Sequence, residues 1–471
     1  MKTSNKYTKN DNKRRERMLS LKAFKAYDIR GVYPTEVNEE LAYNIGRVFV
    51  AMYGAESVVV GHDIRKSGRA LVDALSHGLC DGGCDVIDIG ECGTEMIYFA
   101  TSYLNADGGI MVTASHNPSE YNGMKLVRRG SRPISADTGL MEIGKMAVAS
   151  KMTKGVAPGN TIGKVTNCKI MEPYIKHLLG YIDLKAIKPL KIVANPGNGG
   201  AGVVLAELEK HLPIEVIKIN ETPDGTFPNG VPNPLLIQNR EATAKLVRET
   251  KADIGIAWDG DFDRCFFFDE KANFIEGYYI VGLLAQVFLE KSPGEKIMYD
   301  PRLTWNTEEI VDEAGGKKVR CKSGHAFMKE CMRKNGVLYG GEMSAHHYFR
   351  DFSFCDSGMI PWLLVLEYMS KTGKMLSELV EERMDKFPCS GEINRKVNDA
   401  AAILATLEEK YSTGKVDHLD GLSIDFDKWR FNVRLSNTEP VMRLNVETRG
   451  DKELLAEKTA EILKIIGGKE A

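Results

Sequence analysis

Ser57-Val-Val-Val60, Asp85-Val-Ile-Asp-Ile89 and Gly109-Ile-Met-Val-Thr113 are the three short apolar runs that decide the fold of this chain. The residues between them have the spacing of amphipathic helices, around 70–80 and near 95–100. Strands and helices that alternate in this order build a largely parallel sheet with helices on its faces. The sequence therefore predicts an α/β unit in this part of the chain.

The same alternation recurs twice further along the chain. A second unit runs from Leu190-Lys-Ile-Val-Ala194 to Asp253-Ile-Gly-Ile-Ala257, and a third begins at Lys296-Ile-Met-Tyr299 and continues to about residue 380. From Glu392 onward the pattern changes to a helix, several strands and a last helix. We expect three α/β units and a small α+β unit, although no residue-level repeat relates the units.

A chain of 471 residues is too long for one hydrophobic core, so several domains are expected. The first seventeen residues hold seven Lys/Arg and almost no large apolar side chains, which is typical of a flexible tail. Alternatively, the functional chain begins at Met18. The predicted division is a tail over residues 1–20 and domains over 21–160, 161–272, 273–388 and 389–471.

Composition excludes several classes of protein. Hydrophobic residues make up 43% of the chain, charged residues 27%, and the formal net charge is -2, which argues against a nucleic-acid binder. No stretch approaches the roughly 18–20 apolar residues of a membrane span. Nine cysteines without a C-x-x-C pair indicate reduced thiols in a cytoplasmic protein and argue against a zinc site.

The first segment that carries chemistry is Met111-Val-Thr-Ala-Ser-His-Asn-Pro118. The apolar strand ends in a turn that presents Ser115 beside His116, and Asn117-Pro118 forces the backbone out of regular structure. A hydroxyl on a rigid strand end suits a nucleophile or a phosphate carrier. Taken alone, a Ser-His pair is more often a local hydrogen bond than a catalytic dyad.

The second segment is Asp259-Gly-Asp-Phe-Asp-Arg264, which also follows an apolar strand. Three carboxylates at alternate positions of a loop can converge on one hard cation, and oxygen is the ligand type that Mg²⁺ prefers. Without a cation or an arginine they would repel one another strongly. A phosphatase that uses Asp259 as nucleophile is an alternative that this segment leaves open.

A third segment, Gly197-Asn-Gly-Gly-Ala-Gly202, favours a different class. It matches the G-x-G-x-x-G fingerprint of dinucleotide-binding folds, and Glu221 follows about 20 residues later, as that fingerprint requires. Glycines can equally serve a tight turn and close helix packing. A nicotinamide-dependent enzyme is therefore a second alternative.

Two later loops are suited to sugar and phosphate recognition. Gly341-Glu-Met-Ser-Ala-His-His-Tyr348 combines a carboxylate, hydroxyls and imidazoles, which suit a polyol, and its adjacent histidines should point to opposite sides of a strand. Arg434-Leu-Ser-Asn-Thr-Glu-Pro440, after a short strand over residues 431–433 and with Arg443 beyond, combines cations, hydroxyls and turn N–H groups that suit a phosphate.

Taken together and in this order, the segments resemble the α-D-phosphohexomutase family from about Phe24 to Ile466. The resemblance rests on Phe24-Lys-Ala-Tyr-Asp-Ile-Arg-Gly31, the Thr-Ala-Ser-His-Asn-Pro segment, and the loops at 259–264, 341–346 and 434–440. Tyr299-Asp-Pro-Arg-Leu-Thr-Trp-Asn306 and residues 436–440 look most like the family's phosphomannomutases. The resemblance implies three related α/β mixed-sheet domains and a C-terminal α+β, TATA-binding-protein-like domain around a central cleft. It also identifies the glycine-rich segment as a structural turn.

The resemblance also implies roles for individual residues. It assigns a phosphoserine to Ser115 and places Mg²⁺ on Asp259, Asp261, Asp263 and an oxygen of phosphorylated Ser115. Groups near the reacting phosphate would be Tyr27, Arg30, His116, Lys125, Arg264 and His325, with Lys125 the favoured general acid/base and His325 the second choice. Groups that bind substrate would be Arg302, Glu342, Ser344, His346, Arg434, Ser436, Asn437, Thr438 and Arg443.

The implied activity is the interconversion of mannose 6-phosphate and mannose 1-phosphate through a phosphoserine and a hexose 1,6-bisphosphate, which also serves as activator. The two ends of the sugar are too far apart for one in-line displacement, so a covalent carrier is needed. Glucose phosphates are alternative substrates, because some dual-specificity members carry lysine where this chain has Arg302. The partners expected are small sugar phosphates, for a monomer or a small homo-oligomer.

Overall fold

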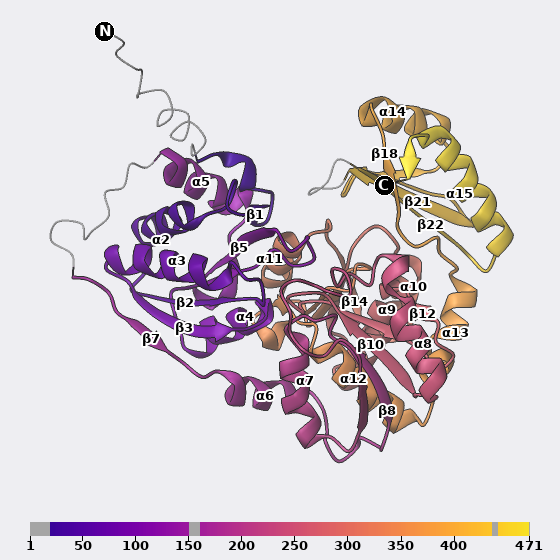
Figure 1. Cartoon of the computed structure of the whole chain (residues 1–471). Coiled ribbons are helices and arrows are strands. Elements are labelled where there is room, and N and C mark those ends of the chain that lie inside the picture. The colour runs from indigo at the N-terminus through magenta and orange to yellow at the C-terminus, as the bar shows by residue number, and fades with distance from the viewer. Residues whose placement is uncertain (1–18, 150–160, 436–440, 471) are drawn as a thin grey trace, which may run out of the picture.

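The computed structural model of the chain describes residues 19–149, 161–435 and 441–470. They form four sheets, one in each of four consecutive parts of the chain, with helices packed around them (Figure 1). The predicted class is confirmed: three mixed α/β units are followed by a C-terminal unit with an antiparallel sheet.

The first sheet has seven strands in the order β1-β5-β4-β2-β3-β7, with β6 paired to β5. Its centre is parallel, because β2 pairs in the same direction with both β3 and β4, as the alternation predicts. On the other side β5 runs antiparallel to β4 and to β1. The strands are β1 Ile29–Val32, β2 Ser57–His62, β3 Asp85–Glu91, β4 Gly108–Val112, β5 Tyr121–Arg128, β6 Arg132–Pro133 and β7 Val165–Asn167; the helices are α2 Glu39–Tyr53, α3 Gly68–Asp81, α4 Thr94–Tyr103 and α5 Leu140–Ala149.

The second sheet repeats this arrangement with the order β12-β11-β10-β8-β9. Its strands β8, β9 and β10 are parallel, and β11 and β12 are antiparallel additions at one side. The strands are β8 Lys191–Asn195, β9 Glu215–Lys218, β10 Ile254–Trp258, β11 Cys265–Phe268 and β12 Phe274–Ile275; the helices are α6 Met171–Leu179, α7 Ala201–Leu208 and α8 Glu241–Thr250.

The third sheet has the order β14-β13-β15-β16-β17 and the same pattern of directions. Its strands are β13 Lys296–Tyr299, β14 Lys317–Arg320, β15 Tyr339–Gly341, β16 His347–Phe349 and β17 Cys355–Asp356. Its helices are α9 Gly277–Lys291, α10 Trp305–Glu313, α11 His325–Asn335, α12 Ile360–Thr372 and α13 Leu376–Lys386.

The common topology places three loops at equivalent positions. In each α/β unit the last parallel strand is followed by an antiparallel neighbour, β5 after β4, β11 after β10 and β16 after β15. The connections are residues 113–120, 259–264 and 342–346, which are the three chemistry-bearing segments of these units. The repeat that the sequence does not show is therefore a repeat of topology.

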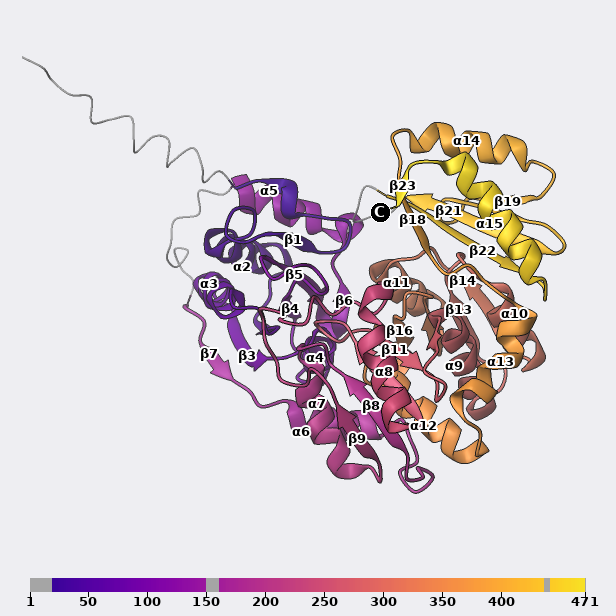
Figure 2. The same ribbon diagram turned by 45° about the vertical axis from the view of Figure 1, so that its right-hand side comes forward.

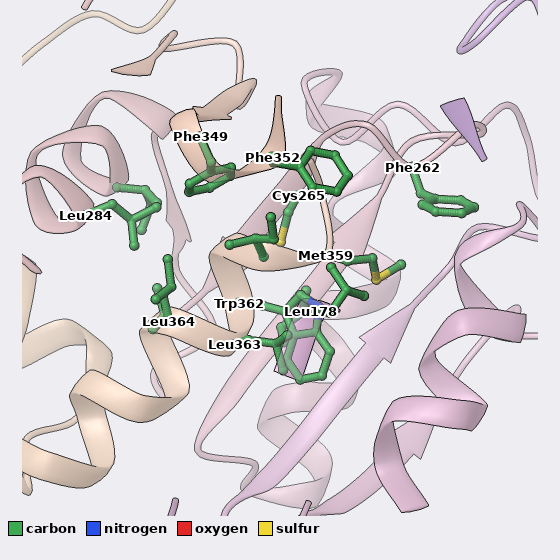
Figure 3. Packing of buried hydrophobic residues seen from close by; sticks show 14 of the residues in the cluster. Leu178, Phe262, Cys265, Leu284, Phe349, Phe352, Met359, Trp362, Leu363 and Leu364 are labelled. Carbon is green, nitrogen blue, oxygen red and sulfur yellow. The ribbon is translucent and has the colours of Figure 1, made fainter. Parts of the chain in front are cut away.

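A continuous apolar core holds the three α/β units together. Trp362 of α12 and Met359, the residue before that helix, belong to the same buried cluster as Phe262 and Cys265 of the second unit and Leu178 of α6 (Figure 3). The cluster extends to α4 of the first unit through Ile97 and neighbouring side chains. The loops of the three units are thus held by one packed body.

The C-terminal unit has a separate core and stands apart from the first unit in both views (Figures 1 and 2). Its six-stranded sheet has the order β19-β20-β21-β22-β18-β23, and the described pairings within it are antiparallel. The strands are β18 Ile393–Lys396, β19 Lys415–Asp417, β20 Leu422–Asp425, β21 Trp429–Leu435, β22 Met442–Thr448 and β23 Lys469–Glu470; the helices are α14 Ala400–Lys410 and α15 Lys452–Ile466. β21 is longer than predicted, so Arg434 lies in a strand rather than in the turn after it.

A buried polar contact joins this unit to the third. Glu447 of β22 accepts hydrogen bonds from the Tyr278 hydroxyl and from the backbone N–H of Thr304, and it pairs with Arg430. Arg430 also donates to the carbonyl oxygens of Pro301 and Arg302. The C-terminal sheet is therefore fixed directly to the backbone that carries Arg302.

Two further sequence predictions concern membranes and thiols. Among the described residues, no helix combines the length and apolarity that crossing a bilayer demands. All nine cysteines are free thiols. The predicted domain boundaries and the predicted tail over residues 1–20, most of which lies outside the described part of the chain, stay predictions.

Candidate active site

Ser115 lies in the turn after β4 with a left-handed backbone conformation, φ 50°. For a residue other than glycine this conformation costs roughly 1–2 kcal/mol, and such strain is concentrated at functional sites. The Ser115 hydroxyl lies 3.1 Å from Nδ1 of His116 and 3.3 Å from Oδ2 of Asp259, and the Ser115 N–H donates to the Thr113 hydroxyl. The side chain therefore faces the loop of the second unit.

Arg65 holds this turn in place, and the sequence prediction missed it. Its guanidinium donates to the carbonyl oxygens of Ser115, Asn117, Pro118 and Tyr121, and it pairs with Asp63. A signal was present in the sequence. The loop that carries Arg65 follows β2, and the carboxyl ends of neighbouring parallel strands meet at one edge of a sheet, where ligands bind in α/β folds.

The carboxylate cluster consists of Asp259, Asp261 and Asp263 in the turn between β10 and β11. All three side chains are buried, and one oxygen of each lies within 4.8 Å of the others. Lys125 of β5 compensates part of the charge, since its Nζ lies 2.7 Å from Asp261 and 2.6 Å from Asp263. Arg264 pairs with Asp259 at 2.8 Å.

The carboxylate cluster fits a hard cation. Oδ1 of Asp261 and Oδ1 of Asp263 are buried and have no hydrogen-bond partner among the described residues, and such orphaned oxygens are costly unless something binds them. Burial, and then the nearby Asp263 and Asp261, raise the pKa of Asp259 above its usual value, against the opposing effect of Arg264. Oxygen donors in this arrangement suit Mg²⁺.

Lys125 and Arg264 differ in what they contact. Burial opposes the charge of Lys125, but Asp261 and Asp263 outweigh it and raise its pKa, so the ammonium keeps its proton. Arg264 reaches across to the first unit, with Nη2 2.6 Å from Nδ1 of His116. Burial, Arg264 and Arg30 lower the pKa of His116 well below its usual value, so His116 is a neutral acceptor.

Arg30 and Tyr27 of the first unit have different partners in the fold. Arg30 donates to the amide oxygen of Asn117 at 2.7 Å and pairs with Asp28. The Tyr27 ring meets the His325 ring edge to face at 5.5 Å between centroids. The first unit and the third are thus in contact through these two rings.

His325 and His346 belong to a buried polar network of the third unit. Nδ1 of His346 lies 2.8 Å from Asp356 and 3.9 Å from Asp263, so this imidazole lies between the network and the carboxylate cluster. The other Asp356 oxygen pairs with Lys329 at 2.7 Å, and Lys329 Nζ lies 3.4 Å from Nδ1 of His325. Asp356 and Lys329 were not predicted, because neither stands in a recognisable motif.

The two adjacent histidines do point apart, as predicted. His347 is fully buried, and its Nδ1 lies 2.7 Å from the Tyr339 hydroxyl of β15. Burial lowers the pKa of His347 to about 3, with a smaller contribution from His346. His347 is a packing residue.

Arg302 connects the sugar-recognition loop with the C-terminal unit. Its guanidinium forms two hydrogen bonds with Asp300, at 2.8 and 2.9 Å, and lies 3.2 Å from the Ser344 hydroxyl and 3.4 Å from Glu342. Its Nη1 lies 3.2 Å from Glu392. The structure therefore brings together Arg302, Glu342 and Ser344, as the resemblance implies.

The arginine cluster consists of Arg302, Arg434 and Arg443 with Glu392 between them. Arg434 of β21 and Arg443 of β22 are directly opposite each other in the antiparallel pair. Each lies 3.2 Å from a Glu392 oxygen. The other three residues predicted for this site, Ser436, Asn437 and Thr438, lie outside the described residues.

The predicted residues therefore form two clusters, and one turn touches both. Glu342 at the start of the turn lies against Arg302, and its backbone N–H donates to the carbonyl oxygen of His346. His346 at the end of the turn faces Asp263 of the carboxylate cluster. Between them, Ala345 has a left-handed φ of 70°.

The glycine-rich segment is a structural turn that supports the carboxylate cluster. A Cβ at Gly199 would lie 2.8 Å from the carbonyl oxygen of Gly260, and one at Gly202 would lie 2.4 Å from that of Glu221. A Cβ at Gly260 itself would lie 2.7 Å from the carbonyl oxygen of Ser115. The glycines serve close backbone packing, which removes the main support for a nicotinamide enzyme.

Comparison with known families matches four domains in order along the chain. The phosphoglucomutase/phosphomannomutase alpha/beta/alpha domains I, II and III match residues 21–149, 172–273 and 276–387, and the C-terminal domain of the same family matches residues 392–465.

Individual relatives cover nearly the whole chain. A protein of Xanthomonas campestris pv. campestris described as a phosphohexose mutase is 57% identical over 452 residues, which cover 96% of this chain and 100% of that protein. A phosphomannomutase of Salmonella montevideo is 56% identical over 458 residues, 95% of this chain and 100% of the relative. The crystal structure of a phosphoglucomutase/phosphomannomutase family protein from Burkholderia thailandensis superposes with a TM-score of 0.85 at 32% identity, over 96% of this chain and 100% of that one.

Proposed function

Because the chain belongs to the phosphoglucomutase/phosphomannomutase family, we propose that it moves a phosphate group between O6 and O1 of mannose by way of Ser115. It is a phosphohexomutase of the phosphomannomutase type. The observation that carries the role of Ser115 is its position, with its hydroxyl 3.3 Å from Asp259 at the edge of the carboxylate cluster.

The proposed cycle has two transfers. Phosphorylated Ser115 gives its phosphoryl group to the free hydroxyl of the sugar phosphate: the bond from phosphorus to the serine oxygen breaks, one to the sugar oxygen forms, and the hydroxyl proton passes to a base. The resulting bisphosphate turns end for end, and the second transfer returns the other phosphate to Ser115. A distant site must hold the phosphate that does not react in either orientation.

Individual residues have distinct proposed tasks. Mg²⁺ bound by Asp259, Asp261 and Asp263 would offset the charge that spreads over the transferring group. Lys125 keeps its proton and suits a donor to the serine oxygen as it leaves, and Arg264 lies close enough to share that charge. Burial lowers the pKa of His325 well below its usual value, so its imidazole is neutral near pH 7 and is the second candidate for the proton acceptor.

The sugar and the distant phosphate are proposed to bind on the other side of the turn at 342–346. Glu342 and Ser344 would bind sugar hydroxyls, with His346 in the same loop. Arg434, and beyond the described residues Ser436, Asn437 and Thr438, would bind the phosphate that does not react, assisted by Arg443 and Arg302. Glucose phosphates are the second candidate substrates, because Arg302 stands where some dual-specificity members carry lysine.

The test is a coupled assay that compares mannose 1-phosphate with glucose 1-phosphate, with a trace of hexose 1,6-bisphosphate, for the protein and for Ser115→Ala. We expect turnover to fall by at least about a thousandfold in the variant, because a covalent nucleophile is lost. Intact-mass and peptide analysis should locate acid-stable phosphate on Ser115, and Ser119→Ala, an exposed serine four residues away, should behave like the parent.

Undiminished turnover of Ser115→Ala would contradict the proposal. A hydroxylamine-labile phosphate on Asp259, with net release of inorganic phosphate, would support the phosphatase instead.

A further inference from the structure

Glu392 lies in the middle of the arginine cluster. Its carboxylate oxygens lie 3.2 Å from Nη1 of Arg302, 3.2 Å from Nη2 of Arg434 and 3.2 Å from Nη1 of Arg443. The side chain is only 18% exposed. One carboxylate thus contacts three guanidinium groups inside the protein.

The three arginines come from two different units. Arg302 follows β13 of the third unit, whereas Arg434 and Arg443 are opposite partners on β21 and β22 of the C-terminal unit. Like charges directly opposite each other in a sheet are destabilising, so an anion between them is favourable. Glu392 lies on the chain between α13 and β18, which joins the two units.

The charge state of Glu392 follows from these contacts. Burial alone would raise the pKa of Glu392, but Arg443, Arg302 and Arg434 together lower it, so the side chain is a carboxylate near neutral pH. Arg302 is also paired with Asp300 and Glu342, and Arg434 Nε lies 4.0 Å from Asp420. Glu392 is the carboxylate that Arg434 and Arg443 share.

A carboxylate and a phosphate make the same kind of contact with arginine, two charge-assisted hydrogen bonds in a planar fork. We propose that Glu392 is an internal occupant of the phosphate site, which the non-reacting phosphate of the sugar substrate displaces from Arg434 and Arg443. This inference rests on the proposed function, in which Arg434 binds that phosphate.

Such an occupant has a use in the proposed cycle. The bisphosphate must leave the distant site, turn end for end and bind again before the second transfer. Glu392 returns to Arg434 and Arg443 whenever the phosphate leaves, so these two guanidiniums keep a shared anion. Competition by Glu392 therefore weakens the hold on the phosphate and favours its release.

The experiment measures the Kd of inorganic phosphate by calorimetry and the KM for mannose 1-phosphate, for the protein and for Glu392→Gln. The amide keeps the shape but removes the competing charge. We expect both constants to fall about tenfold, since a charge-assisted contact no longer has to be broken. Added phosphate should also raise the Tm of the variant more than that of the parent.

Two further variants separate charge from shape. Glu392→Asp keeps the charge but reaches less far, so its constants should lie between those of the parent and of Glu392→Gln. Glu309→Gln is the matched control, because Glu309 also pairs with two cations, Arg383 and Lys386, away from the site. Its phosphate affinity should equal that of the parent.

Arg434→Gln distinguishes failure of this inference from failure of the proposed function. If Arg434→Gln leaves the KM and the phosphate affinity unchanged, the proposed phosphate site is wrong. If Arg434→Gln weakens binding while Glu392→Gln leaves it unchanged or weakens it as well, Glu392 merely positions the arginines and the inference is overturned. The Tm of each variant without phosphate confirms that it is folded.

Discussion

The two clusters of the site are opposite in sign and in construction. In the carboxylate cluster three anions are paired with two cations: Lys125 contacts Asp261 and Asp263, and Arg264 contacts Asp259. In the arginine cluster three cations surround one anion, Glu392. The first cluster is ready for a cation and the second for an anion.

The clusters also differ in where they are built. The carboxylate cluster lies between the first and second units, which share one apolar core. The arginine cluster lies between the third unit and the C-terminal unit, which has a separate core. Transfer of a phosphoryl group requires fixed geometry, because small displacements cost large factors in rate. A site that must release and rebind a phosphate is better placed at a junction between separate cores.

The largest effect is expected from a change in the carboxylate cluster. Asp261→Asn removes a charge that Lys125 and a bound Mg²⁺ both need, so kcat should fall by more than about 100-fold with KM nearly unchanged. Titration of activity with Mg²⁺ should show a matching loss of metal affinity. Removal of Mg²⁺ by a chelator should reduce the parent enzyme to the level of the variant.

The control for this change is Asp253→Asn, at the opposite end of β10, where the carboxylate accepts a hydrogen bond from the backbone N–H of Lys191. This variant should keep its Mg²⁺ requirement and its kcat. A large rise in KM of Asp261→Asn with unchanged kcat would mean that the two clusters do not differ in task.

A smaller effect is expected in the arginine cluster. Arg302→Lys keeps the charge but loses the fork that contacts Asp300, Glu392 and Ser344 together, so the KM for mannose 1-phosphate should rise about tenfold while kcat changes little. The ratio of kcat/KM for glucose 1-phosphate to that for mannose 1-phosphate should rise, as measured in the coupled assay.

Arg383→Lys is the matched control, because Arg383 is a partly buried fork on Asn306 and Glu309, which belong to neither cluster. Its KM should match that of the parent. A fall in kcat of Arg302→Lys without a change in KM would place Arg302 on the reacting side and remove the distinction between the clusters.

The smallest effect is expected for His347 of β16, the strand that follows the turn at 342–346, and it is an effect on stability. The pKa of His347 is lowered by burial to about 3 in the folded state, so the unfolded chain binds the extra proton between pH 6.5 and 3. The stability that depends on a neutral His347 is therefore fully present above pH 6.5 and is lost as the pH falls toward 3. His347→Phe removes it and should leave kcat at pH 7 unchanged.

Urea unfolding at pH 7 and pH 5 is the measurement for this prediction. Between pH 7 and pH 5 the free energy of unfolding of the parent should fall by about 2 kcal/mol more than that of His347→Phe. The difference arises because the unfolded parent binds one extra proton over the roughly 1.5 pH units between its unfolded pKa and pH 5. An identical fall in both proteins would mean that burial does not lower the pKa of His347 in the folded state.

Much of this arrangement could be predicted from short runs of sequence. The apolar runs of the α/β units predicted their parallel strands, and Ser115 and the three aspartates were recognised because each follows such a strand. Proximity of the two loops is dictated by topology, since equivalent strands end at equivalent turns. The predicted roles of these residues await the experiments above.

The rest depends on contacts between units, which no local pattern records. Glu392 precedes a short strand and resembles any exposed glutamate, yet three arginines from distant positions surround it. Arg65 binds the Ser115 turn from a position 50 residues earlier in the chain. Lys329 and Asp356 pair with each other from different elements of the third unit. The glycine-rich segment shows the converse, a distinctive pattern whose purpose is only close packing.

The contacts that cross from the first unit to the carboxylate cluster bear on the order in which the chain folds. Thr94 donates to Asp261 through both its N–H and its hydroxyl, and Lys125 reaches Asp261 and Asp263 from β5. A second unit that folded alone would have to expose or protonate these aspartates, because buried charges without partners are costly. We therefore expect the ribosome's order of synthesis to assist folding: the first unit emerges complete and supplies the counter-charges on which the second unit closes.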